Sequence, residues 1–234
     1  MGNSVYSKPI FFAVLSAVVI LIGTVITTFY PMVMPSTQPK SGYVKPYAAL
    51  EIEGRDIYIR EGCNNCHTQT IRPLRTEVLR YGDYSKPEEF AYDSPHLWGS
   101  RRVGPDLARI GGKYADSWQY VHTVSPQKMF AASNMPRYTW LAEAKLDTSY
   151  TFKKSSVLGF GYSEAEVQKQ LDDERTRLTS ASYRYKVQRD EAIPAGYRAD
   201  LTELDALVAY LQRLGRDYKD SQKTAVASAA TGGN

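Results

Sequence analysis

The sequence predicts an all-α protein in which a single N-terminal transmembrane helix precedes a larger helical domain with long loops. Three observations support this fold class: an uncharged apolar run near the N-terminus, helical spacing of apolar residues near both ends of the remaining chain, and irregular stretches rich in proline and glycine between them. The mean hydropathy of −0.41 therefore averages a polar body with one very apolar segment. Because 43% of the 234 residues are hydrophobic, the body has enough apolar material for a core.

The apolar run extends from Ile10 to Phe29, about 20 residues, which is the length that an α-helix needs to cross a hydrocarbon core. A cleavable signal peptide and a buried core helix are the alternatives. The run is too long for the apolar part of a signal peptide, and no small-residue cleavage site is evident. We therefore expect residues 1–30 to form a retained membrane anchor. Lysines lie on both sides of the run, so charge does not fix the orientation of the helix.

The remaining chain is expected to contain a linker, one domain and a tail. Prolines punctuate residues 31–47, which predicts an extended linker. The domain is expected to span residues 48–218. Residues 219–234 are small and polar, and we expect them to be a disordered tail.

Helical periodicity places three helices in the domain. The first is expected over residues 48–61 and the last over residues 202–214, where leucines form a stripe and a glycine follows. Between them, Ser163 and Glu166 have the spacing of a capping box, which predicts a helix over residues 163–177. The stretch after residue 67 to about residue 98 is expected to be loops with one or two short helices.

The two cysteines, Cys63 and Cys66, stand directly before His67 in a C-x-x-C-H pattern. In this pattern two thiols add to the vinyl groups of a haem, and the adjacent histidine is placed to bind its iron. A thioredoxin-type redox site is the alternative, but no βαβ unit surrounds the motif and that site needs no adjacent histidine. With only two cysteines, a disulfide framework or a four-cysteine zinc site cannot form. The sequence therefore predicts one covalently bound haem c.

The opposite axial position of the iron has four candidate donors: Met129, Met135, His96 and His122. We favour Met135, because Pro136 disfavours a helix there and leaves the thioether on an extended segment that can reach the iron. The segment around it also resembles the Met-Pro-aromatic segment of known c-type cytochromes. Met129 is interpreted as a core methionine in a short helix, and both histidines as hydrogen-bonded structural residues.

The segment Gly104 to Leu107 resembles the Gly-Pro-x-Leu turn of class I cytochromes c. That resemblance implies that the carbonyl of Pro105 accepts the proton on the far nitrogen of His67, which fixes the tautomer and the ring plane. The first and last helices resemble the crossing pair of the same fold, with Gly54 at the crossing. The expected fold is thus an anchor helix followed by a class I cytochrome c-like domain with long loop insertions.

A more specific resemblance lies in the long stretch after the motif. The chain resembles the mono-haem cytochrome c subunit (subunit II) of cbb3-type cytochrome c oxidases. The segments that carry this resemblance are His67 to Pro73, Glu77 to Gly82, Trp98 to Ser100, Gly104 to Tyr114 with Trp118, and Asn134 to Pro136 with Trp140 and Leu141.

The resemblance implies an electron-transfer subunit that is not an enzyme by itself and has no catalytic residues. Its expected partners are an integral-membrane subunit with haem b and a haem-copper oxygen site, a di-haem cytochrome c subunit, a soluble cytochrome c and membrane lipid. Covalent haem attachment occurs outside the bacterial cytoplasm, which implies the orientation of the single inner-membrane span: the N-terminus lies in the cytoplasm and the haem domain in the periplasm.

Two other functions remain open at this stage: the small cytochrome subunit of a nitric oxide reductase, and a membrane-tethered haem sensor of gases. Nucleic acid is not an expected partner, because the net charge is only +4 and basic residues are scattered among acidic ones. Several arginines are candidates for binding haem propionates or an acidic partner; they are Arg72, Arg75, Arg101, Arg102 and Arg137. Residues 151–200 receive no role from the resemblance.

Overall fold

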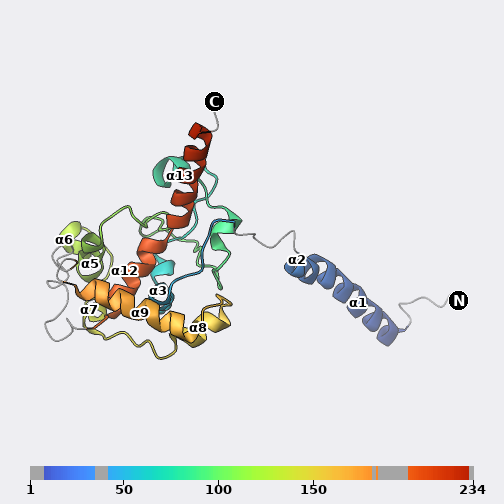
Figure 1. Cartoon of the computed structure of the whole chain (residues 1–234). Coiled ribbons are helices and arrows are strands. Elements are labelled where there is room, and N and C mark those ends of the chain that lie inside the picture. Colours follow the sequence, from blue (N-terminus) through green and yellow to red (C-terminus); the bar gives the residue numbers. More distant parts are fainter. Residues whose placement is uncertain (1–7, 35–41, 181–182, 184–199, 232–234) are drawn as a thin grey trace. The chain divides into compact units, whose positions relative to one another are not determined.

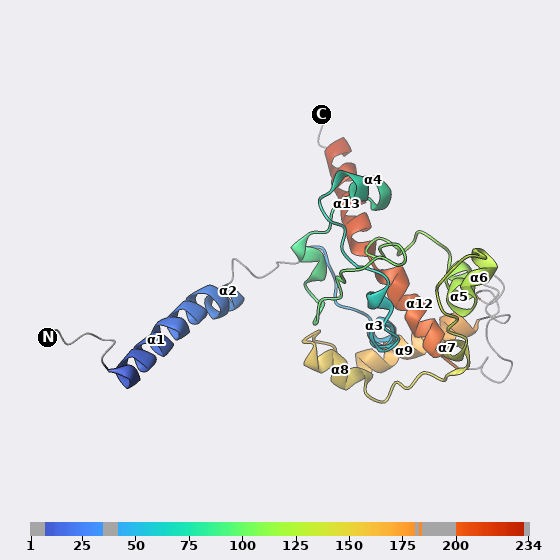
Figure 2. The ribbon, with the colours of Figure 1, turned by 180° about the vertical axis from the view of Figure 1, so that it is seen from behind.

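The computed structural model describes residues 8–34, 42–180, 183 and 200–231. The chain divides into two units, Met1–Lys40 and Ser41–Asn234, and each is described by itself. Figure 1 shows the helices of both units, and Figure 2 shows them from behind.

The first unit is a single run of helix from Pro9 to Val33, and none of its most apolar 18-residue window is buried. It consists of α1 (Pro9–Thr24), the π-helical turn η2 (Val25–Phe29) and α2 (Tyr30–Val33). The prediction of one apolar helix that could span a membrane is confirmed. The helix continues past residue 30 and contains Pro31, which has no N–H to donate. The wider turn before this proline, in which the N–H of Tyr30 donates to the carbonyl of Val25, accommodates the missing bond.

The second unit is helical, and its described residues contain no β-strand, so the all-α prediction is confirmed. Its elements, in chain order, are α3 (Ala49–Arg60), η3 (Cys63–Asn65), α4 (Arg75–Tyr81), η4 (Pro87–Phe90), α5 (Asp116–Val124), α6 (Pro126–Met129), α7 (Trp140–Glu143), α8 (Thr151–Val157), α9 (Glu164–Thr179), α12 (Glu203–Arg213) and α13 (Arg216–Thr231).

The crossing of α3 and α12 forms the centre of the core, as the first and last helices were expected to do (Figures 1 and 2). Gly54 lies at the crossing, where a Cβ atom would stand only 1.9 Å from the carbonyl oxygen of Ala206. Next to it the rings of Tyr58 and Tyr210 pack with centroids 5.3 Å apart. A glycine is therefore required here, because the two backbones approach too closely for any side chain.

The capping box that the sequence predicted is present at the start of α9. Ser163 accepts from the N–H of Glu166, whose carboxylate in turn accepts from the N–H of Ser163. Thr202 and Asp205 form the same reciprocal pair at the start of α12. Each pair satisfies backbone donors that a helix N-terminus otherwise leaves without partners.

Helix α8, in the segment without an assigned role, packs on α3 through a buried carboxylate. Glu53 is only 4% exposed, and it accepts hydrogen bonds from the hydroxyl of Thr151 and the ammonium of Lys154, both at 2.6 Å. Lys154 also pairs with Asp56 at 2.8 Å. The charge of Glu53 is thereby compensated, which is the condition for burying it without a large desolvation cost.

The prediction of a disordered tail from residue 219 differs from the structure, which continues α13 to Thr231. The chain restarts as a helix after Gly215, whose φ of +74° ends α12. Lys219 then binds the domain, because its ammonium donates to the carbonyls of Arg109 and Gly111 at 3.0 and 2.6 Å. The alanines, lysines and glutamine of this segment favour helix once its first turn is held in place. Residues 232–234 of the tail lie outside the described residues.

Candidate haem site

The C-x-x-C-H motif lies directly after α3, on a tight turn that begins at Gly62. This glycine has a φ of +70°, which reverses the chain at the end of the helix. The N–H of His67 donates to the carbonyl of Cys63 at 2.9 Å, so the motif forms one helical turn. This turn brings Cys63 and His67 to the wall of the same cavity. Cys63 and Cys66 are not joined in a disulfide.

The cavity has a volume of about 400 Å³, within the range of about 300–1,000 Å³ that is usual for bound ligands. Its polar and sulfur-containing wall includes Cys63, His67, Met135 and His122. Its apolar wall consists of Leu107, Ile110, Leu141, Leu207 and Leu211, which come from a loop, α7 and α12. Such a wall suits a haem, which is a planar and largely apolar macrocycle with an iron at its centre. The leucines would pack against the macrocycle, and the sulfur and nitrogen donors would bind the iron or the edge of the ring.

His67 is oriented for metal binding. Its Nδ1–H donates to the carbonyl of Pro105 at 2.8 Å, which leaves Nε2 as the atom free to bind a metal. Burial lowers the pKa of His67 and so favours the neutral ring that binds metals. The ring also touches Gly104, where a Cβ atom would lie only 2.2 Å from Cε1 of His67. The Gly-Pro turn thus packs against the histidine ring through Gly104. Through the carbonyl of Pro105 it accepts the hydrogen bond from Nδ1–H.

Of the two candidate methionines, only Met135 lines the cavity. It lies on a segment outside the helices, where the side chain of Gln127 donates to its carbonyl at 2.9 Å. Met129 ends the four-residue helix α6 and is 41% exposed, so its interpretation as a core methionine was wrong. Met129 is the last residue of a single helical turn, and neither core cluster of the described residues includes it.

Of the two candidate histidines, only His122 lines the cavity. It stacks on Trp118 with centroids 4.5 Å apart, and its buried Nδ1 has no hydrogen-bond partner among the described residues. His96 is exposed and stacks on Trp98 at 4.5 Å instead. Among the described residues, both histidines stack on a tryptophan, and the expected hydrogen bonds are not found. Geometry leaves Met135 and His122 as the donors that share a cavity with His67.

Two buried polar atoms of residues that line the cavity could bind the propionate groups of a haem. The Nε2 of Gln119, a residue that is only 2% exposed, and the Nε of Arg109 have no partner among the described residues, and both side chains line the cavity with His122. Buried donors are normally hydrogen-bonded, so unpaired ones beside a cavity indicate a ligand with acceptor groups. Haem propionates are such groups, and the residues present therefore fit a haem.

The thiol chemistry of Cys63 also separates the two interpretations of the motif. Burial raises the pKa of Cys63 to about 12, so the group stays a protonated thiol at neutral pH. A thioredoxin-type site needs a cysteine whose pKa is lowered, because the thiolate is its nucleophile. The environment of Cys63 therefore disfavours the redox-dithiol alternative.

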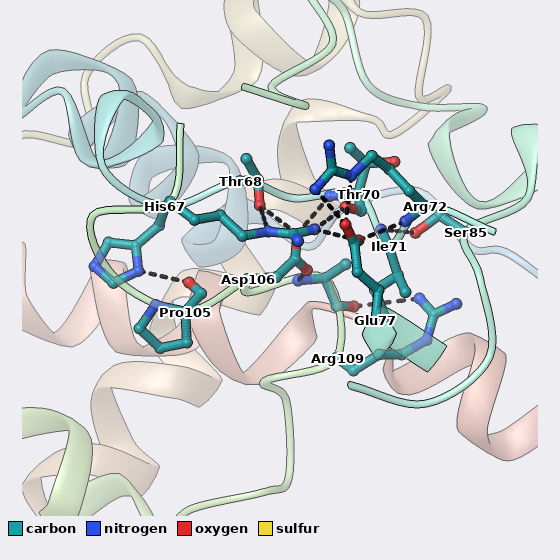
Figure 3. Close-up of polar contacts among 12 residues, drawn as sticks. His67, Thr68, Thr70, Ile71, Arg72, Glu77, Ser85, Pro105, Asp106 and Arg109 are labelled. Atoms are coloured by element: carbon teal, nitrogen blue, oxygen red, sulfur yellow. Dashed lines mark hydrogen bonds and ion pairs between the residues drawn. The ribbon is translucent and has the colours of Figure 1, made fainter. Parts of the chain in front are cut away.

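A buried polar network surrounds the turn that holds His67, and the sequence did not predict it. Figure 3 shows Asp106 with the His67–Pro105 pair on one side and Glu77 on the other. Arg102 donates to Glu77 at 2.7 Å and to Asp106 at 3.3 Å. The only sequence signal was the four-residue spacing of Arg102 and Asp106, which is common among solvated charges.

Three of the five arginines that were candidates for binding propionates or a partner have other contacts. Arg72 and Arg102 both pair with Glu77, and Arg137 donates to the side chain of Gln127. Arg109, which the sequence did not single out, lines the cavity and pairs with Glu89. Its guanidinium also lies over the ring of Tyr218, 4.2 Å from the centroid. Arg109 differs from the other arginines in being buried at the cavity wall. Sequence spacing does not reveal this position.

Comparison with known families gives one match. A family model described as "Cytochrome C oxidase, mono-heme subunit/FixO" matches residues 3–218, which is nearly the whole chain and includes the motif, the Gly-Pro turn and Met135. No curated protein sequence matches the chain.

Proposed function

The chain belongs to the family of mono-haem subunits of cbb3-type cytochrome c oxidases, and on this premise we propose that it is the electron-transfer subunit that feeds the oxygen-reducing subunit. It is a membrane-anchored oxidase subunit with one candidate span. The proposed cofactor is one haem c, held covalently by Cys63 and Cys66. The proposed axial ligands of its iron are His67 and Met135.

The observation that carries this proposal is the shared cavity of Cys63, His67 and Met135, with an apolar wall between them. A bound haem would supply reversible one-electron chemistry at iron. The chain itself would hold the macrocycle, present His67 as a neutral ligand, and keep water away from the iron through its leucine-rich wall. Electron transfer needs no acid, base or nucleophile, so the proposed role requires geometry and a tuned reduction potential rather than a catalytic residue.

The proposed direction of electron flow follows from the family. The haem would take electrons from a di-haem cytochrome c subunit or a soluble cytochrome c and pass them to haem b of the integral-membrane subunit. Because haem is attached covalently outside the bacterial cytoplasm, the proposed topology puts the haem domain in the periplasm and the N-terminus in the cytoplasm.

A strain that lacks this chain tests the function. Its membranes should lose oxygen uptake with a reduced cytochrome c donor, and the full-length chain should restore that uptake. A chain with Cys63→Ala and Cys66→Ala should fail to restore it and should show no haem staining on denaturing gels. If oxygen uptake is normal without the chain while nitric oxide reduction is lost, the oxidase proposal is wrong and the reductase takes its place.

A further inference from the structure

The carboxylate of Asp106 connects the turn that contains Gly104 and Pro105 to the segment directly after the haem motif. Its side chain is fully buried. One oxygen, Oδ2, accepts from the hydroxyl of Thr68 at 2.5 Å and from the N–H of Thr70 at 3.0 Å. The other oxygen, Oδ1, accepts from the N–H of Ala108 at 2.8 Å. A carboxylate bound on both sides in this way holds two segments in one relative position.

Backbone bonds on either side of Pro105 complete this attachment. The N–H of Gly104 donates to the carbonyl of Cys66 at 3.1 Å, and the N–H of Leu107 donates to the carbonyl of Thr68 at 2.8 Å. Pro105 has no N–H to donate, so the bonds of Gly104 and Leu107 fix the backbone on either side of it. The position of its carbonyl against His67 therefore depends on the bonds made by the residues around it.

Arg102 extends the attachment to the inserted loops. Its Nε donates to the hydroxyl oxygen of Thr68 at 2.6 Å, and the same hydroxyl donates onward to Asp106. Its Nη2 donates to the carbonyl of Thr70 at 2.8 Å and to Glu77 of α4 at 2.7 Å. Thr68 thus stands between a cation and an anion, and its hydroxyl needs both partners. These contacts give the inserted helix α4 a physical connection to the axial histidine (Figure 3).

We propose that Asp106, Thr68 and Arg102 are positioning residues for the axial histidine, which fix the Pro105 carbonyl against Nδ1–H of His67 and so set the reduction potential of the haem. This inference rests on the proposed haem site. A firm acceptor at Nδ1 makes the ring a stronger electron donor, which stabilises ferric iron and lowers the potential. The negative charge of Asp106 in this turn acts in the same direction, since it stabilises the additional positive charge of ferric iron.

The test compares variants of the full-length, haem-loaded chain purified in detergent. Asp106→Asn removes the charge and one acceptor, and Thr68→Val removes the hydroxyl with no change in charge. Both should raise the midpoint potential of haem c. Both should also speed solvent exchange of the Nδ1 proton of His67 in the reduced protein by about tenfold, as expected when about one hydrogen bond is lost. Thr68→Ser keeps the hydroxyl and should behave as the unsubstituted chain.

A matched control separates positioning from stability. Glu53→Gln alters a buried carboxylate that binds Thr151 and Lys154 and does not line the cavity, so it should lower the melting temperature but leave the potential and proton exchange unchanged. If Thr68→Val fails to load haem, Arg102→Lys replaces it, because it keeps the charge and loses the Nε bond to Thr68. That variant should also raise the potential.

The outcomes distinguish this inference from the function on which it rests. Two haem-loaded variants decide the positioning role: Asp106→Asn, and either the Thr68 or the Arg102 variant. If both keep the original reduction potential and the original slow exchange of the His67 Nδ1 proton, the positioning role is wrong and the haem site stands. The positioning role is also wrong if Glu53→Gln shifts the potential equally. If Asp106→Asn alone raises the potential, the effect is one of charge and the positioning role again fails. If the unsubstituted chain carries no covalent haem, the proposed function itself fails.

Discussion

At the scale of single residues, the chemistry of the site depends on which side chains share one cavity. His67, Met135 and His122 line it, whereas Met129 and His96 do not. A methionine and a histidine opposite His67 would give haems of different potential, because thioether ligation favours ferrous iron. The proposed ligand pair is therefore open to a direct spectroscopic check.

We predict that Met135→His keeps a six-coordinate haem, lowers its reduction potential and removes the near-infrared band of Met-ligated ferric haem. Met129→Leu should leave the band in place, because Met129 is exposed and outside the cavity. His122→Phe should also retain the band, since a phenyl ring can still stack on Trp118. Loss of the band in His122→Phe, with its retention in Met135→His, would contradict the choice of Met135.

Glu77 makes the stability of the domain depend on pH. The hydrogen bond from Arg102 lowers the pKa of Glu77 to about 2, from an ordinary value of 4.5. A carboxylate whose pKa is lower in the folded state stabilises that state above the unfolded value and loses this contribution as the pH falls through the folded one. The stabilisation from Glu77 should therefore be complete at neutral pH and decrease between about pH 4.5 and pH 2.

Urea unfolding of the full-length chain across this pH range measures that dependence. Glu77→Gln should unfold more easily at neutral pH, and the difference from the unsubstituted chain should shrink as the pH falls toward 2. A constant difference at every pH would show that Glu77 contributes through packing rather than through its charge.

At the scale of elements, the crossing of α3 and α12 determines how closely the two ends of the domain pack. The only residue type that permits the observed approach is glycine at position 54, because a Cβ would meet both the Ala206 carbonyl and Cβ of Tyr210, at 1.9 and 2.8 Å. α12 also contributes Leu207 and Leu211 to the cavity wall. A shift at the crossing would therefore reach the haem site.

We predict that Gly54→Ala destabilises the domain by about 2 kcal/mol, because overpacking against backbone outweighs the gain in helix propensity of about 1 kcal/mol. A fall of several degrees in the melting temperature of the haem-loaded chain would be the measured effect. Gly42→Ala is the matched control, since a Cβ at Gly42 meets no atom within 4 Å. Equal melting temperatures for Gly54→Ala and Gly42→Ala would contradict the close approach.

At the scale of the whole molecule, the anchor and the haem domain are separate units. Among the described residues, the main hydrophobic core draws on positions between Tyr47 and Leu214, and none of its members comes from the apolar helix. We therefore expect the domain to fold, and to bind its proposed haem, without the anchor. Under the proposed function, the anchor would keep the domain at the membrane of its partner subunit.

We predict that a chain without residues 1–40, secreted behind a cleavable signal, gives a soluble domain with haem and an unchanged reduction potential. Oxygen uptake by membranes of a strain that makes only this form should fall sharply relative to the full-length chain, with both normalised to haem c. Loss of haem from the truncated domain would show that the anchor contributes to folding, in contradiction to the division of the chain.

The sequence by itself determined the features that depend on neighbours along the chain. The anchor follows from one apolar run, the haem motif from three fixed positions, and the cap of α9 from two residues three apart. Gly54 was also identifiable, because a glycine inside a helix costs stability and needs a packing reason. The helical end of the chain was misjudged, since its composition is polar and its contact to the domain through Lys219 is not local.

Only the tertiary structure decided which distant residues meet. It brought Met135 and His122 to the cavity of His67, and it left Met129 at the surface. It also joined Thr68, Arg102 and Asp106, whose polar side chains look in sequence like those of any solvated loop. The physical reason is that burial and hydrogen bonding depend on distances across the fold, and sequence spacing fixes such distances only within a helix, strand or turn.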